Sequence, residues 1–201
     1  MAKRRKNHKA QIKKWTSRHT NIVNALARFN ILTVENLRKA STVSGKQMSE
    51  TSFLDMEELG YFRRETIEYK NKFIEVAIID DKSIRKVRDI STETTRNIYN
   101  SSSKAHDLEH SNFIFDMFEI EDIQKYYKSE KELANLMINN SLDIEVSVTD
   151  GAFIYDDERL NVFIETATQH YKDEQRIAHE NYASAMNGKF IENKVRIQKI
   201  D

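Results

Sequence analysis

The 201-residue sequence predicts an α+β protein with two units. In the first half, apolar residues recur at helical spacing in three segments, and two strand-like runs about a short polar turn follow them. In the second half, helical segments flank two further strand-like runs. A polar stretch rich in Ser and Thr, residues 91–103, separates the halves and is predicted to be a linker.

The composition is that of a globular, well-solvated chain, with 39% hydrophobic and 32% charged residues. The absence of cysteine excludes disulfides, thiolate chemistry and cysteine-ligated zinc sites. No apolar run is long enough to cross a bilayer, and no signal-peptide pattern opens the chain. We therefore expect a cytoplasmic protein without a membrane partner.

The charge is unevenly distributed along the chain, although its formal total is zero. Residues 1–18 contain eight Lys or Arg and no acid. Residues 19–90 carry 12 basic and 11 acidic side chains, and residues 91–201 carry 12 basic against 21 acidic ones. A basic arm over residues 1–18 favours a polyanionic partner at the front of the molecule, although a solvated tail has the same composition.

The first half predicts three helices in succession. Apolar residues from Ile22 to Phe29 recur at helical spacing, and Thr33 is an N-cap candidate for the segment "VENLRKAS". A third helix is predicted from Lys46 to Leu59, and Gly60 is expected to end it in a left-handed conformation.

Two strand-like runs, "YFRRETIEY" and "KFIEVAII", then predict a hairpin about a turn at residues 70–72. Three helices followed by a basic hairpin are the plan of a winged helix-turn-helix domain, here over residues 19–90. In that plan the third helix reaches base edges in the major groove, and basic side chains of the arm and wing neutralise phosphates. The predicted DNA-binding residues are Lys3, Arg4, Arg5, Lys6, Lys13 and Lys14 in the arm, Lys46, Gln47, Ser49, Thr51 and Ser52 on the helix, and Arg63, Arg64, Lys70 and Lys72 on the hairpin.

The second half is expected to begin with a long helix over residues 104–128, for which Ser103 is a cap candidate. A second helical stretch, "SEKELANLMINN", follows it. Val146 and Val148 predict a strand that reaches Asp150, and "LNVFIET" is predicted to return as a buried strand after the turn "DDER". A final helix containing "DEQRIAHENYASAM" precedes a basic tail.

The order of these segments resembles the replication-relaxation family of plasmid, phage and conjugative-element proteins. The resemblance covers roughly residues 18–186 and is carried by "LGYFRRE", "HSNFIFDMF", "VTDGAFIY", "VFIETAT" and "HENYASA", the last with Tyr182. It implies that the protein acts in a bacterial or phage-infected cell, and that residues 104–201 form a small α/β domain of the restriction-endonuclease type, the PD-(D/E)XK plan.

In that plan two acids hold magnesium and a lysine helps to activate the attacking water. The resemblance places Asp150 as the first acid and Glu165 as the second. Ala167 stands where the lysine belongs, and Lys172 is the candidate for a displaced lysine. The motif therefore indicates an inactive nuclease scaffold, with no cofactor unless magnesium binds to a working site.

Our first hypothesis is a non-enzymatic, sequence-specific DNA-binding protein of a mobile element, acting in replication or transcription control. Its partner would be double-stranded DNA, and we expect a homodimer because paired half-sites multiply a modest affinity. The alternative is a magnesium-dependent nuclease or nicking enzyme that the winged helix targets to DNA. A third hypothesis is a protein-interaction module. His106 and His110 have metal-ligand spacing but no evident third ligand, so they are interpreted as ordinary surface or capping histidines.

Overall fold

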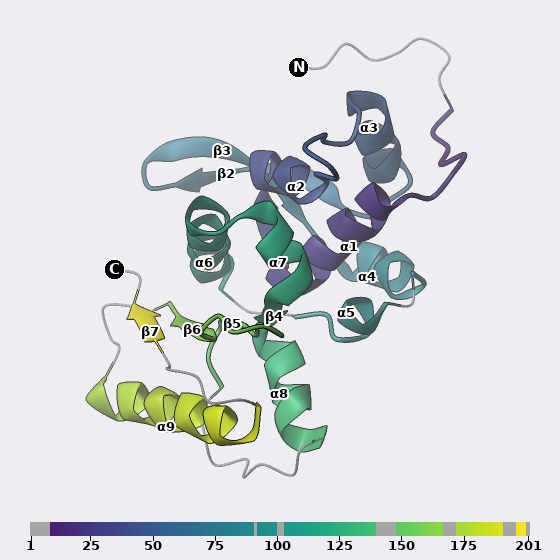
Figure 1. Cartoon of the computed structure of the whole chain (residues 1–201). Helices are drawn as coiled ribbons and strands as arrows, with labels where there is room; N and C mark the ends of the chain where they lie inside the picture. Colours follow the sequence, from purple (N-terminus) through teal and green to yellow (C-terminus); the bar gives the residue numbers. More distant parts are fainter. Residues whose placement is uncertain are drawn as a thin grey trace.

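The structure is a computed structural model that describes residues 9–90, 92–99, 103–139, 148–166, 172–190 and 196–199. It is a mixed α+β protein with two small sheets, and helices cover both faces of each (Figure 1). The elements of the front part are α1 (Ser17–Phe29), β1 (Ile31–Thr33), α2 (Val34–Ala40), α3 (Glu50–Glu58), β2 (Arg63–Tyr69) and β3 (Lys72–Ile78).

The first sheet is antiparallel, with strand order β1-β3-β2. The predicted hairpin is confirmed: β2 pairs with β3 from Arg63↔Ile78 to Tyr69↔Lys72. Its turn has two residues, Lys70 and Asn71, with φ of 48° and 61°. Two consecutive positive φ angles are typical of the tight turn whose twist matches a hairpin.

The two faces of this sheet bury different side chains, because successive residues of a strand point to opposite sides. Leu32 and Ala77 belong to the main core beneath α1, α2 and α3. Their neighbours Ile31 and Val76 face the other way and pack with Leu108 of α6 (Lys104–Met117). Figure 1 shows α6 between the hairpin and the second sheet.

The predicted third helix is wrong at its start. It begins at Glu50 and not at Lys46, because the Ser49 hydroxyl accepts a hydrogen bond from the backbone N–H of Ser52 and caps the helix there. Lys46 instead forms an isolated bridge with Val43. The other two terminal predictions are confirmed: Thr33 caps α2, and Gly60 follows α3 with φ of 78°.

Three elements of the front part were not predicted. They are the short strand β1 and the helices α4 (Asp81–Arg88) and α5 (Glu93–Arg96), the second of which lies inside the predicted linker. Asp80 caps α4 by accepting hydrogen bonds from the backbone N–H groups of Lys82 and Ser83. The linker prediction missed α5 because its four residues are too few to show a helical period.

The predicted long helix over residues 104–128 is also wrong, because it is broken near Phe118. Phe118 is extended, with φ of −126° and ψ of 148°, and its ring stacks on Phe153 at 4.0 Å. This contact turns the chain, so a separate α7 follows α6, and Tyr127 opens a strand. The remaining elements are α7 (Ile120–Tyr126), β4 (Tyr127–Ser129), α8 (Glu130–Asn139), β5 (Gly151–Phe153), β6 (Val162–Glu165), α9 (Asp173–Phe190) and β7 (Arg196–Lys199).

The second sheet has strand order β4-β5-β6-β7, antiparallel except for the parallel pair β6-β7. Phe153 and Ile164 point into the main core with α1, α6 and α7, whereas Phe163 points into a second cluster. That cluster contains Leu133 of α8 and Tyr182 of α9. The predicted returning strand is confirmed in β6, while Val146 of the predicted preceding strand lies outside the described residues.

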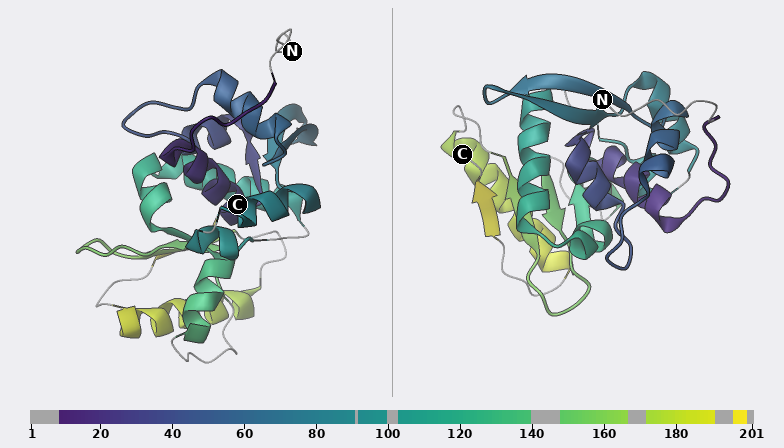
Figure 2. Two further views of the ribbon diagram at one scale, coloured as in Figure 1. Left: turned by 90° about the vertical axis from the view of Figure 1, so that its right-hand side faces the viewer. Right: turned by 90° about the horizontal axis from the view of Figure 1, so that it is seen from above.

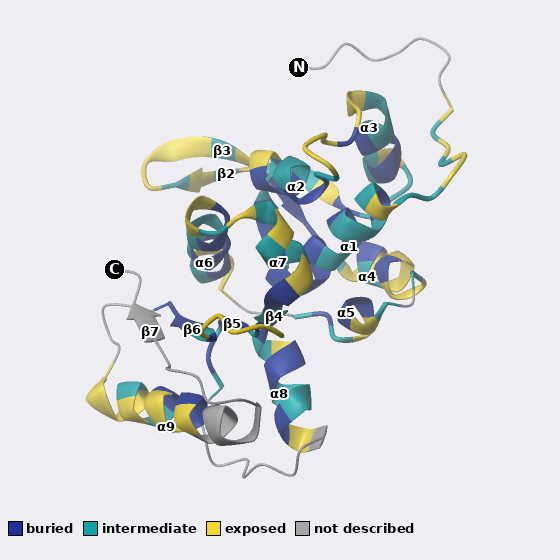
Figure 3. Cartoon of the chain, viewed as in Figure 1, coloured by how far each residue is buried: buried dark blue, intermediate teal, exposed yellow. Residues whose placement is uncertain are grey.

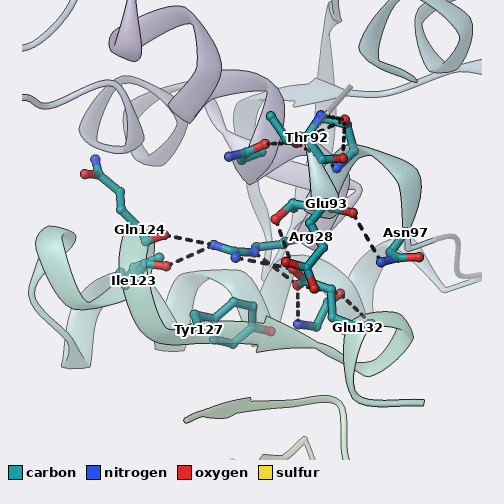
Figure 4. A network of polar contacts seen from close by, with 12 residues as sticks. Arg28, Thr92, Glu93, Asn97, Ile123, Gln124, Tyr127 and Glu132 are labelled. Carbon is teal, nitrogen blue, oxygen red and sulfur yellow. Dashed lines mark hydrogen bonds and ion pairs between the residues drawn. The ribbon is translucent and has the colours of Figure 1, made fainter. Parts of the chain in front are cut away.

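One core joins the front and back parts. Phe29 of α1 stacks on Tyr127 of β4, with ring centroids 4.7 Å apart. Arg28 is buried between the two parts, where its guanidinium pairs with Glu132 at 3.1 Å and donates to the carbonyls of Ile123 and Gln124 (Figure 4). The predicted boundary at residues 91–103 therefore does not divide the packed interior, and buried residues of one core lie on both sides of it (Figure 3).

Candidate functional site

The two acids of the nuclease-like motif lie side by side. Asp150 immediately precedes β5 and Glu165 ends β6, and these strands pair antiparallel with Gly151 opposite Ile164. The backbone N–H of Asp150 donates to Glu165 Oε2 at 3.3 Å, and the N–H of Thr166 donates to Asp150 Oδ2 at 2.7 Å. The sequence mapping thus found a real juxtaposition of two carboxylates.

Two histidines of α6 complete this cluster, and the interpretation of both as ordinary surface or capping residues is wrong. His106 Nε2 lies 3.3 Å from Asp150 Oδ2 and 3.2 Å from the carbonyl oxygen of Thr166. His110 is buried, with Nδ1 2.8 Å from the hydroxyl of Thr166 and Nε2 2.7 Å from that of Tyr127. Their spacing of four residues puts both rings on one face of the helix, toward the end of β6.

His106 supplies the positive charge of the cluster. Hydrogen bonds with Asp107 and Asp150 raise its pKa to about 10, so the ring is cationic at neutral pH. Burial alone would raise the pKa of Asp150, but the hydrogen bond from His106 and the positive charge of that ring hold it below its usual value. The result is an ion pair between a strand end and α6.

Glu165 is in the opposite state. Burial, and then the charge of Asp150, raise its pKa to about 8, so this carboxyl is mostly protonated at neutral pH. Its Oε1 lies 3.5 Å from Nδ1 of His179 on α9, whose own pKa is lowered by burial. Of two neighbouring carboxyl groups, one is therefore ionised and the other neutral.

The buried part of the cluster requires a glycine. A Cβ added at Gly151 would lie 2.4 Å from the hydroxyl oxygen of Tyr127, the group that contacts His110. Gly151 is therefore needed for the close approach of β4 to β5 at the cluster.

The ring of His110 is neutral, because burial lowers its pKa to about 4.

Two buried oxygen atoms are left without a hydrogen-bond partner within the described residues, Asp107 Oδ2 and the hydroxyl of Tyr182. Asp107 also lines a small internal cavity together with His106, His110 and Asp150. Its other oxygen, Oδ1, lies 3.5 Å from His106 Nδ1, so His106 stands between two aspartates.

The arrangement does not fit a magnesium ion, which prefers nearly octahedral oxygen ligands. The Oδ2 atom of Asp150 accepts the N–H of Thr166 and lies against the His106 ring, so it is not open to a metal ion. Across the described parts of the chain, no group of three or more Asp, Glu or His side chains has the geometry of a metal site. The ring of His106 supplies a cationic group at the first acid, where the endonuclease plan would place a metal ion.

The displaced lysine is not seen in this cluster. Lys172 lies exposed just before α9, where its backbone N–H donates to Gln175 Oε1 at 3.0 Å. Ala167 lies outside the described residues. Arg176, a further cation of α9, pairs with Asp173 and Glu180.

A second candidate site lies where the basic arm meets α3. A hollow of about 390 Å³ is lined by Lys13 and Lys14 from the arm and by Thr51 and Ser52 from the first turn of α3. Trp15 anchors the arm: its ring lies 5.1 Å from that of His19, and its indole N–H donates to Thr20. Four predicted DNA-binding residues are thus brought together, while Lys3, Arg4, Arg5 and Lys6 lie outside the described residues.

Helix α3 is acidic, whereas the helix of a winged-helix domain that enters the DNA groove is expected to be polar or basic. Its sequence "ETSFLDMEE" carries four acids and no base, and Asp55 among them is buried. Lys46, Gln47 and Ser49 precede the helix. The first turn of α3 offers the neutral polar side chains of Thr51 and Ser52, but it also carries Glu50.

Most of the hairpin cations are neutralised within the chain. Arg63 pairs with Glu65 at 2.7 Å and Arg64 with Glu57 at 2.7 Å. Lys70 pairs with Glu109 of α6 at 2.8 Å. Lys72 is exposed, and no carboxylate of the described chain lies within ion-pair distance of it. The hairpin is thus less positive than its lysines and arginines alone indicate.

Comparison of the chain with protein families, curated proteins and solved structures found no match. The resemblance to the replication-relaxation family stays a prediction. None of the described helices combines the length and apolar character needed to cross a membrane.

Proposed function

We propose that the protein binds double-stranded DNA through a winged helix-turn-helix unit formed by α1 to β3. The observation that carries this proposal is topological. The element order is helix, strand, two helices and hairpin, with sheet order β1-β3-β2, and this order supports the assignment. That is the arrangement with which such domains address a duplex.

The proposed contact uses the first turn of α3 and not its whole length. Backbone N–H groups at a helix N-terminus attract phosphate, and Thr51 and Ser52 add hydroxyl groups. Lys13 and Lys14 lie across the same hollow and supply the positive charge that α3 lacks. Asp55 of α3 also lines this hollow, so the two lysines of the arm must outweigh a carboxylate there.

We propose that residues 104–201 support the DNA-binding unit and do not contact DNA themselves. The pairing of His106 with Asp150, and the contacts of His110 with Thr166 and Tyr127, fix α6 against the second sheet. α6 in turn packs on the first sheet. We propose that the protein acts as a homodimer on paired sites, in replication or transcription control of a mobile element.

Fluorescence anisotropy with labelled duplex DNA tests this proposal. Each phosphate contact that a lysine makes contributes about one unit to the slope of log affinity against log salt concentration. The double variant Lys13→Ala/Lys14→Ala should therefore bind more weakly and lower the slope by about 2. Lys131→Ala, at an exposed position on α8, is the matched control and should behave as wild type.

A magnesium-dependent nuclease is the second candidate, and the adjacency of Asp150 and Glu165 is the observation that favours it. The ring of His106 against Asp150 speaks against it. Incubation of supercoiled plasmid with protein and Mg²⁺ or Mn²⁺ decides between the two. Cleavage that Asp150→Ala and Glu165→Ala both abolish would establish the nuclease.

A further inference from the structure

The tip of the β2–β3 hairpin carries a phenylalanine that the fold does not bury. Phe73 is 79% exposed, the largest exposed fraction among the large apolar side chains of the described chain. In the view from above, the hairpin forms an outer edge of the molecule (Figure 2), and in Figure 1 its tip extends beyond α6. Single exposed apolar side chains are common on protein surfaces, so the informative feature of Phe73 is its position beside the hairpin turn and not its exposure alone.

The hairpin holds this ring away from the protein. Phe73 lies opposite Glu68, on one face of the strands, whereas Ile67, Tyr69 and Ile74 are packed against the cluster that contains Leu108 of α6. The salt bridge from Lys70 to Glu109 fixes the tip on that side. Because the turn has only two residues, Phe73 has no loop through which it can fold back.

Both basic and acidic side chains lie near the Phe73 ring, the basic ones in or next to the turn and the acidic ones along the strands. Lys70 and Lys72 lie at the tip, within three residues of Phe73, and residues 69–73 contain no acid. Glu68, directly opposite Phe73, and Glu75 lie on the same face as Phe73, whereas Lys72, opposite Tyr69, lies on the other face. An anionic partner that approaches the tip end-on would meet the ammonium group of Lys72, because that of Lys70 is paired with Glu109.

We propose that Phe73 is an aromatic wedge that enters the minor groove of duplex DNA and partly unstacks a base step. This inference depends on the DNA-binding function proposed above and identifies the wing as the part that distorts the duplex. Apolar side chains inserted between base pairs kink DNA in this way, and neighbouring lysines bind the flanking phosphates.

A single ring suits a base step better than a protein surface. A protein interface is built around a contiguous buried core of several apolar and aromatic groups. Phe73 is the only large apolar side chain of the hairpin exposed to this degree, among those that the structure describes. A base, in contrast, offers a flat face that one ring can cover.

Duplex DNA containing 2-aminopurine at successive positions tests the proposal, because the fluorescence of this base rises when it is unstacked. Wild type should raise the fluorescence at one step. Phe73→Ala should abolish the rise and weaken duplex binding roughly tenfold. Met117→Ala, which removes another exposed apolar side chain, is the matched control and should change neither reading. Lys72→Ala should weaken binding while the fluorescence rise at saturation remains.

The possible results distinguish a failure of the proposed wedge from a failure of the proposed DNA binding. If wild type binds duplex and Phe73→Ala matches it in affinity and fluorescence, the wedge is refuted and DNA binding stands. A larger loss on single-stranded than on duplex DNA would also refute the minor-groove wedge. So would the loss of a wild-type dimer in Phe73→Ala, measured by sedimentation, because the ring would then contact a second copy. If wild type binds no DNA at any salt concentration, the proposed function itself fails.

Discussion

Replacing Glu165 by glutamine tests the electrostatics of the acidic cluster. Glutamine has the shape of the protonated carboxyl group, can still accept the N–H of Asp150, and cannot ionise. The folded pKa of Glu165 is about 8, above the ordinary value of 4.5, because of burial and the charge of Asp150. Between these values the folded protein holds a proton that the unfolded chain has released.

Because the folded state binds more protons than the unfolded chain in this range, the free energy of unfolding falls as the pH rises. The free energy of unfolding contributed by Glu165 is largest at low pH, falls as the pH rises through this window, and levels off above about pH 8. One pH unit corresponds to about 1.4 kcal/mol, so the wild type should lose about 2 kcal/mol from this group between about pH 6 and pH 8. The Glu165→Gln variant lacks this loss.

Urea unfolding of both proteins at a series of pH values measures the effect. The histidines of the cluster titrate in both proteins, so their contributions cancel in the difference. The difference in unfolding free energy should grow by about 2 kcal/mol in favour of Glu165→Gln over this range. Glu174→Gln, at an exposed position in the first turn of α9, is the control. Parallel curves for wild type and Glu165→Gln would refute a neutral Glu165.

Further variants test the packing around the cluster. Gly151→Ala forces a methyl group against the Tyr127 hydroxyl and should lower the free energy of unfolding by about 1 to 3 kcal/mol, measured with urea. Arg28→Ala leaves the Glu132 carboxylate buried without its partner and should cost about 3 to 5 kcal/mol by the same method; a loss near zero would contradict the role of this pair in joining the two parts. Asp150→Ala should leave duplex affinity unchanged in anisotropy, and a large loss would place the acid cluster in the DNA contact.

The sequence predicted those elements whose own residues determine them. The hairpin follows from two regular strand patterns about a polar turn, and the start of α2 follows from the hydroxyl of Thr33. The break at Phe118 could not be predicted in the same way. It depends on the stacking of this ring on Phe153, which lies far along the chain and in another element.

The cluster around Asp150 and Glu165 was likewise predicted only in part. The order of motifs paired Asp150 with Glu165, because both lie at the ends of strands that the sequence indicates. It missed His106, although a histidine one turn before His110 was a usable signal, because the partner of His106 comes from a different element. The neutralisation of Arg64 by Glu57 also depends on how α3 meets β2 and is not visible in charge counts.

The salt dependence of duplex binding tests the central claim most directly. If the arm and the first turn of α3 bind phosphates, log affinity of the wild-type protein should fall linearly with log salt concentration, with a slope of about −0.9 for each phosphate neutralised. A duplex affinity that is absent at low salt, or that does not change as salt is raised, would contradict the claim.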